Sequence, residues 1–237
     1  MKKIWSFLIS LGLLAAPLAN YAAPDDNHGA DRLKTCGEVM SDIMDLPDNI
    51  PPTLLDKSVC VVVVPSVIKA AFLGGGLYGR GAMSCRGGDN FDGPWSAPSM
   101  MRVEGGSFGA QAGVQATDLV LLIMNVRGAE SILTSKVKIG GDASAAAGPV
   151  GRAAEADTDA SMRAEILSYS RARGLFAGVA IVGSTLRQDD DANAEVYGKE
   201  LSATDIVRGG VVAATPEGQQ LISVLEKHSP QPEKPAK

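Results

Sequence analysis

The chain has 237 residues, a formal net charge of −5 and only 5% aromatic residues. An acidic chain lacks the basic face that bulk binding of nucleic acid requires, so nucleic acid is not an expected partner. The low aromatic content and the 27 glycines indicate packing by close backbone approach rather than by bulky side chains.

Residues 1–23 have the pattern of a secretory signal peptide. Lys2 and Lys3 precede an apolar run over residues 4–19, which is short for a membrane span. We expect cleavage near Ala22 or Ala23, with an uncleaved anchor as the alternative, and no cysteine follows closely enough for a lipoprotein. Cleavage changes the charge from −5 to −7 because two lysines and no acid are lost. We therefore expect a periplasmic or secreted protein, whose remaining residues, about 210, suffice for one sizeable core.

The first elements follow from hydrophobic spacing and prolines. Residues 24–30 form a polar linker, and apolar residues at helical spacing predict an amphipathic helix over 31–46. The proline pair in 48–52 excludes a regular helix there. The β-branched run at 59–64 predicts a buried strand, and residues 65–72 are expected to form a short helix before three consecutive glycines.

The rest of the chain predicts short strands with glycine corners. Residues 160–173 fit a helix or a strand, and a hairpin turning near Gly174 is favoured. A proline-rich tail over 229–237 is expected to be disordered. The expected class is α+β, with a mostly antiparallel, glycine-rich curved sheet or barrel and a few flanking helices. The other expected strands are 77–85, 100–103, 107–115, 119–125, 136–139 and 175–185, with strand and loop over 140–152, and the other helices are 128–135, 202–208 and 216–227.

Three cysteines leave one unpaired if a disulfide forms. Cys60 opens one predicted strand and Cys85 closes the next, so a hairpin would bring them together. One interpretation is therefore a Cys60–Cys85 disulfide with Cys36 free, and the other is three buried thiols.

Several glycine-rich motifs match catalytic or nucleotide-binding patterns without their context. Residues 105–109 match G-x-S-x-G, but the two histidines, His28 and His228, lie in the leading linker and at the start of the tail. Residues 74–79 match G-x-G-x-x-G away from a strand end, and 141–149 lacks the Lys-Ser/Thr of a phosphate loop. We expect no catalytic residue and no cofactor.

Acidic residues near the C-terminal third match part of a calcium loop. Asp189, Asp191, Asn193 and Glu200 occupy its first, third, fifth and twelfth positions, but Ala194 replaces the required glycine. A cation loop and ordinary Asx turns both remain open. Isolated cysteines without nearby histidines exclude a zinc site, and no metal site is predicted.

Four cations stand out in the acidic chain because no acid lies among them. They are Lys57, Lys69, Arg80 and Arg86, and residues 57–86 contain no Asp or Glu. Such a segment creates a local positive field that the net charge hides. The alternative is ordinary solvated surface charge.

Five segments, in order, resemble the SYLF domain, a lipid-binding module that also regulates actin in yeast actin-patch proteins. The resemblance covers nearly all of the chain after the predicted leader, as one domain over 31–228. The segments are VVVVPSVIKAAFLGGGLYGRG, WSAPSMMRVEGGSFGAQAGVQATDLVLLIMN, KVKIGGDASAAAGPVGRAAEADTDA, SYSRARGLFAGVAIVGSTL and DDDANAEVYG.

The resemblance implies non-enzymatic binding of acidic phospholipid, phosphoinositides included, or of another amphiphile. Lys57, Lys69, Arg80 and Arg86 are the candidate lipid-binding residues, and an anionic phospholipid or membrane surface is the expected partner. The helix at 31–46 stands where the family's membrane-touching helix would, but its acids outnumber its cations, which favours capping of the sheet.

The resemblance also bears on possible protein partners. Some family members bind actin filaments, but an exported chain without a partner domain is not expected to meet actin, so actin binding is not expected. The alternative to lipid binding is an interaction or structural module that meets another envelope protein.

Overall fold

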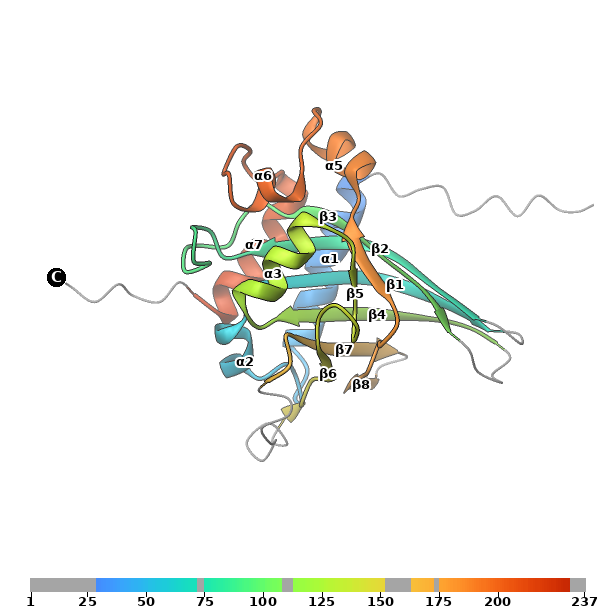
Figure 1. The fold of residues 1–237 in the computed structure, drawn as a ribbon. Helices are drawn as coiled ribbons and strands as arrows, with labels where there is room; N and C mark the ends of the chain where they lie inside the picture. Colours follow the sequence, from blue (N-terminus) through green and yellow to red (C-terminus); the bar gives the residue numbers. More distant parts are fainter. Residues whose placement is uncertain (1–28, 72–74, 108–112, 152–162, 173–174, 231–237) are drawn as a thin grey trace, which may run out of the picture.

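The computed structural model describes residues 29–71, 75–107, 113–151, 163–172 and 175–230. Its centre is a strongly curled nine-stranded sheet in the order β5-β9-β3-β2-β1-β4-β7-β6, with β8 also paired to β7 (Figure 1). The pairs are antiparallel except for β6 with β7. This confirms the predicted α+β class with a mostly antiparallel curved sheet. The strands are β1 (Cys60–Ala71), β2 (Gly75–Cys85), β3 (Ser99–Ser107), β4 (Gly113–Ile123), β5 (Val137–Lys138), β6 (Ala145–Ala147), β7 (Ile166–Ala172), β8 (Leu175–Gly178) and β9 (Thr185–Gln188).

Two helices that pack on each other cover one face of the sheet. They are α1 (Gly29–Met44) and α7 (Pro216–His228), and α1 runs across the strands behind the sheet in Figure 1. The apolar stripe of α1, which includes Met40 and Ile43, is buried against this face with Val61 and Val63. The predicted helix therefore caps the sheet, and its apolar side faces the core.

The opposite face carries a second core. Alternate residues of β1 such as Val62 and Val64 point to this side. They pack with Ile132 of α3 (Val126–Thr134) and Ile206 of α6 (Ala203–Val207). Because both sides of its central strands are buried, β1 reads as a run of valines rather than as an alternating pattern.

A short helix was expected over residues 65–72, but β1 continues through residues 65–71, and that prediction is wrong. Residue 72 lies outside the described residues. The strand register shifts between Val64 and Val67, which marks a bulge. Pro65 fits there because a bulge frees a residue from the hydrogen-bond ladder. The Ser66 amide donates instead to Asp118 Oδ1 at 3.0 Å, so the ladder resumes through Ala71.

The β1–β2 pair depends on a glycine without a side chain. A Cβ placed on Gly81 would lie 2.0 Å from the Val63 carbonyl oxygen, a distance that no packing adjustment accommodates. The glycine-rich sequence of β2 therefore reflects close approach of two backbones.

A disulfide closes the inner end of this hairpin. Cys60 and Cys85 are cross-strand partners with 3.9 Å between their Cα atoms, and they are bonded. Cys36 is a free, buried thiol that donates to the Val63 carbonyl oxygen at 3.3 Å. Burial raises the pKa of this thiol to about 12. The first of the two cysteine interpretations is confirmed.

Other differences from the sequence prediction lie at helix starts and strand bounds. The strand expected over 107–115 is divided, because residue 107 ends β3, residues 113–115 begin β4, and residues 108–112 lie outside the described residues. Helix α2 (Pro52–Lys57) begins at the second proline of the pair, because Pro52 occupies the first helical position, where its missing amide costs nothing. Helix α5 (Asp190–Tyr197) forms where turns or a cation loop were expected. The predicted hairpin is present as β7 and β8, but the strand expected over 175–185 stops at Gly178. Residue 174 of its turn lies outside the described residues.

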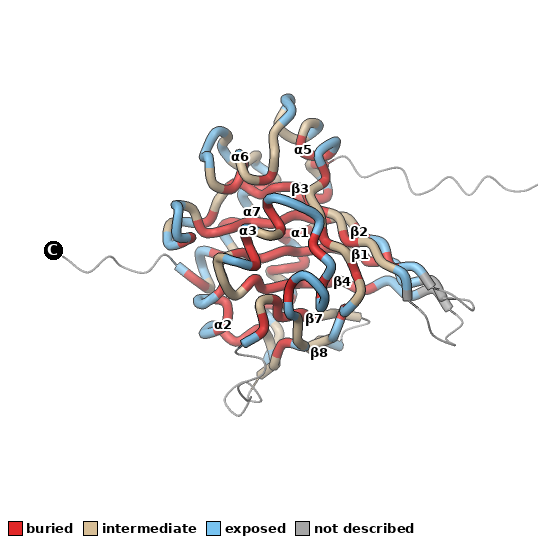
Figure 2. Tube along the Cα trace, in the orientation of Figure 1, coloured by how far each residue is buried: buried red, intermediate tan, exposed pale blue. Residues whose placement is uncertain are grey.

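Four strands extend beyond the helices at one end. The outer ends of β1, β2, β3 and β4 project to the right in Figure 1, and Figure 2 shows that exposure increases along them. We define the outer end as residues 68–71, 75–78, 104–107 and 113–116. The strand register brings these four segments side by side. Within the described ranges, no helix has the length and hydrophobicity that a membrane span needs.

Candidate functional site

The structure does not bring the four candidate cations together. Lys57 is exposed in the last turn of α2, and Lys69 is exposed on β1. They stand near opposite ends of β1, and nine residues of strand from Cys60 to Lys69 span about 30 Å. One lipid headgroup cannot contact both lysines.

Arg80 forms an interior ion pair. It lies on β2, and its Nε donates to Asp189 Oδ2 at 2.7 Å. Side-chain exposure is 18% for Arg80 and 1% for Asp189. The pair joins β2 to the residue that precedes α5, so the guanidinium is committed to the protein interior.

The side chain of Arg86, which follows β2, is buried against the C-terminal end of α7. Its Nη2 donates to the carbonyl oxygen and to the hydroxyl of Ser229, at 2.8 and 2.6 Å. The guanidinium also stacks over the Trp95 ring, 4.3 Å from its centre, while the Trp95 indole donates to the same Ser229 carbonyl. Burial lowers the pKa of Arg86, although Asp56 and Glu226 partly offset this effect. Arg86 thus ties the end of α7 to the hairpin base and is not presented to solvent.

A band of paired charges lies where the helix-covered sheet meets the outer end. Arg171 donates to Asp118 at 2.9 Å and also to Asp42 of α1. Burial alone would lower the pKa of Arg171, but the hydrogen bonds to both carboxylates outweigh it and raise the pKa. Across the sheet, Arg187 donates to Glu104 at 2.8 Å. Positive and negative groups therefore compensate one another in this band.

At the outer end, one charge of the described residues is not paired. The outer end as defined contains two charged residues, Lys69 and Glu104, and Glu104 is paired with Arg187. In the described part of the chain, Lys69 forms no ion pair. The outer end therefore presents a single uncompensated positive charge on glycine- and alanine-rich strands.

Two large apolar side chains are exposed at the same place. Ile68 of β1 and Tyr78 of β2 are direct cross-strand partners, with exposed fractions of 45% and 48%. Tyr78 shares its face of β2 with Ala82, which packs beneath α1, because side chains alternate along a strand. The pair thus lies on the helix-covered face, outside the reach of the helices. Because a helix was expected over residues 65–72, the pairing of Ile68 with Tyr78 was not predicted from the sequence.

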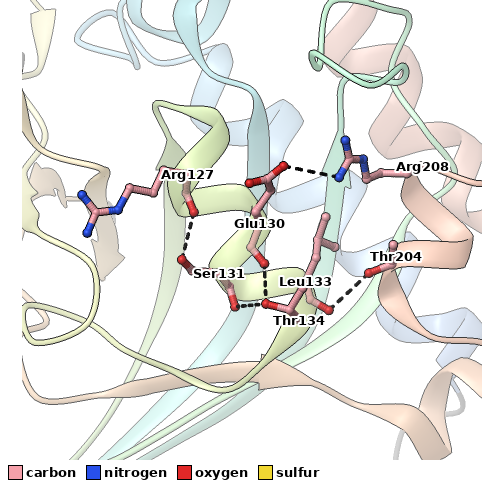
Figure 3. Close-up of a pocket in the computed structure, with 7 residues that line it drawn as sticks. All are labelled: Arg127, Glu130, Ser131, Leu133, Thr134, Thr204 and Arg208. Carbon is pink, nitrogen blue, oxygen red and sulfur yellow. Dashed lines mark hydrogen bonds and ion pairs between the residues drawn. The ribbon is translucent and has the colours of Figure 1, made fainter.

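A surface pocket of about 360 Å³ lies between α3 and α6 (Figure 3). The Ser131 and Thr134 hydroxyls donate to backbone carbonyls of the preceding turn of α3. Arg208 lies 3.6 Å from Glu130 and stacks over Phe91. The Arg208–Glu130 contact joins α6 to α3, as does the Thr204 hydroxyl, which donates to the Leu133 carbonyl oxygen at 3.3 Å. Nothing among these lining residues selects a ligand.

The calcium-like acidic pattern does not form a loop. Helix α5 spans most of it, and the Asp189 carboxylate accepts from Arg80 instead. Among the residues that the structure describes, no three His, Cys, Asp or Glu side chains gather at metal-binding distance.

Comparison with known proteins identifies the family. The family model described as "Ysc84: Las17-binding protein actin regulator" matches residues 104–228. "LAS seventeen-binding protein 3" of Saccharomyces cerevisiae is 32% identical over 216 residues, which cover 90% of this chain and 42% of the relative. The chain belongs to the Ysc84 family. This confirms the resemblance to SYLF domains, because the Ysc84 and SYLF families are the same.

Other Ysc84 relatives extend the comparison to animals. "Protein YSC84" of Saccharomyces cerevisiae is 31% identical over 218 residues, which cover 91% of this chain and 42% of the relative. "SH3 domain-containing YSC84-like protein 1" of Bos taurus is 32% identical over 181 residues, 76% of this chain and 52% of the relative. The chain thus spans about half or less of the relatives it matches.

The family description corrects one expectation about partners. We expected no actin binding by an exported chain, but the matching family is described as Las17-binding actin regulators, and a yeast relative carries a Las17-binding name. Membership in the Ysc84 family therefore does not support setting actin-regulatory partners aside.

Proposed function

We propose that this Ysc84-family protein is a non-enzymatic binding protein for anionic phospholipid surfaces, with the outer end of the sheet as the contact. The family's description as a binding protein and regulator supports a non-enzymatic role. The observation that carries the lipid proposal is the uncompensated Lys69 at an outer end whose one carboxylate, Glu104, is already paired.

Charge alone supplies a weak contact. A lysine near an anionic membrane contributes about 1 kcal/mol, and the contribution falls with salt. Lys57 is exposed at a distant point, and Arg80 and Arg86 are held inside the protein. Binding through the outer end therefore needs an apolar contribution beside Lys69.

We further propose that the protein is exported, with residues 1–23 as a cleaved signal peptide. The Cys60–Cys85 disulfide supports this proposal, because disulfides persist in oxidising compartments and are rare in the cytosol. Mass spectrometry of the protein purified from an exporting bacterial host reads the N-terminus directly. A mass that includes residues 1–23 would overturn the cleavage.

The second candidate function is binding of an actin-regulatory protein. The names of the yeast relatives and the description of the family favour it. Pull-down of a stoichiometric actin-regulatory protein, together with failure to bind lipid, would select this candidate.

Vesicle flotation tests the lipid proposal. The exported protein is mixed with phosphatidylcholine vesicles, or with the same vesicles containing phosphatidylglycerol, at low and high salt. We expect flotation with the anionic vesicles, weakened but not abolished by salt. Absence of flotation under every condition would overturn the proposal, and equal flotation with neutral vesicles would remove the role of charge.

A further inference from the structure

We propose that Ile68 and Tyr78 are the apolar anchor that inserts into the headgroup region of an anionic phospholipid membrane, with Lys69 placed to contact phosphate beside them. This inference rests on the proposed function and names the residues of its site. The three residues lie on two adjacent strands whose register is continuous over this segment.

Ile68 and Tyr78 form a compact apolar contact because they are opposite each other. Cβ atoms of directly opposed residues in an antiparallel pair lie about 5 Å apart. On its other side, Ile68 is opposite Ala116 of β4, which is also exposed. Three side chains in one row, all without a charge, therefore form a continuous apolar strip across three strands.

Among the residues that the structure describes, the other exposed large hydrophobic side chains do not form such a strip. Leu175 is opposite Ala172 at the start of β8, and Val182 and Val211 lie outside the strands. Single exposed apolar residues are normal on protein surfaces. Within the described strands, the register joins two such residues at the Ile68–Tyr78 pair.

The chemistry of the strip matches a membrane interface. Tyrosine has an apolar ring and a polar hydroxyl, and it is enriched at the headgroup level. Lysine buries its aliphatic stem while its ammonium group stays at the phosphates. Lys69 follows Ile68 in the chain and points to the other side of β1. A bilayer that receives the end of the sheet contacts both sides, whereas a flat protein surface meets only one.

The size of the strip also favours a membrane over a protein partner. Stable protein interfaces bury about 800 Å² on each side, and the exposed apolar surface here comes from two large side chains on a narrow four-stranded end. Shallow insertion into a bilayer does not require a broad complementary surface, since binding scales with the apolar area inserted and with the charge.

Flotation of matched variants tests the inference. The double variant Ile68→Ser/Tyr78→Ser is compared with Val211→Ser, which removes an apolar side chain of similar exposure, 49%, between α6 and α7. We expect the double variant to bind anionic vesicles at least about tenfold more weakly, and Val211→Ser to bind like the wild type. Circular dichroism and urea unfolding establish that each variant is folded.

The outcomes separate this inference from the proposed function. If the wild type does not float, the proposed function fails. If the wild type and the double variant float equally, lipid binding stands and the Ile68–Tyr78 anchor is overturned. Lys69→Glu, at an exposed position, provides a second test should the double variant not fold. We expect this variant to lose binding to anionic vesicles but to keep any residual binding to neutral vesicles. Unchanged binding of Lys69→Glu to anionic vesicles would also overturn the inference. So would a wild-type protein that binds no vesicles and forms a dimer that the double serine variant abolishes.

Discussion

Replacing Arg86 tests whether this cation is part of the interior or a ligand for lipid. The substitution Arg86→Met keeps most of the side-chain volume and removes the charge and the donors. It deletes the hydrogen bonds to Ser229 at 2.6 and 2.8 Å and the stacking on Trp95 at 4.3 Å. The Ser229 carbonyl keeps one donor, the Trp95 indole at 3.1 Å.

The magnitude follows from opposing contributions. Hydrogen bonds to a charged group contribute about 1.5–3 kcal/mol each, and a desolvated cation–π contact contributes about 2 kcal/mol. Burying the charge costs part of this, as the lowered pKa of Arg86 indicates, and a methionine regains apolar burial. We expect a net loss of about 2–3 kcal/mol, which corresponds to roughly 5–10 °C in Tm for a domain of this size.

Urea unfolding followed by circular dichroism measures the change, with Lys57→Met as the matched control. Lys57 is exposed, so its replacement should shift the stability by no more than about 0.5 kcal/mol. We also expect Arg86→Met to float with anionic vesicles like the wild type. A variant as stable as the wild type that loses vesicle binding would show that Arg86 acts at the membrane and would refute this assignment.

Four further predictions follow from the core. Arg80→Met should destabilise the protein by about 3 kcal/mol because it leaves the Asp189 carboxylate buried without its partner. In a double-mutant cycle, adding Asp189→Asn should restore part of this loss of stability. Additive losses in the cycle would contradict the pairing. Thiol titration without reductant should find no reactive thiol in the native protein and one after denaturation, since Cys36 is buried and the other cysteines are bonded; three thiols would refute the disulfide. Folding raises the pKa of Cys36 from 9.0 to about 12, so the native state favours the protonated thiol, and its stabilising effect is intact below pH 9 and lost as the pH rises toward 12. Relative to Cys36→Ala, the wild type should lose about 2 kcal/mol by about pH 10.5, and a constant difference would refute the burial. Gly81→Ala should abolish folding because its Cβ would lie 2.0 Å from a carbonyl oxygen. Gly76→Ala should be tolerated because nothing lies within 4 Å of its Cβ. Equal effects of the two substitutions on expression and Tm would contradict the close approach of the two backbones.

Locally encoded elements could be predicted from the sequence. Helix α1 follows from apolar residues at helical spacing, and the structure begins it at Gly29, two residues before the predicted start. The disulfide follows from two cysteines at the ends of successive strands, once a hairpin is assumed. In both cases the signal lies within one segment or between neighbouring segments.

The long-range partners could not be predicted from the sequence. Arg80 pairs with a residue 109 positions away, and Arg86 binds one 143 positions away. A spacing pattern records that cations occur without nearby acids, but it does not show which distant groups the fold brings to them. The bulge at Pro65 has the same origin, because Asp118 of another strand satisfies the amide that follows it.

The most direct test of the outer-end contact is fluorescence quenching by brominated phospholipid. Tyr78→Trp places an indole at the proposed anchor, and Val211→Trp places one at a position of similar exposure between α6 and α7. On anionic vesicles we predict strong quenching of the added Tyr78→Trp emission over the wild-type background and none for Val211→Trp. Equal quenching of both variants, or vesicle binding without quenching at position 78, would contradict the account.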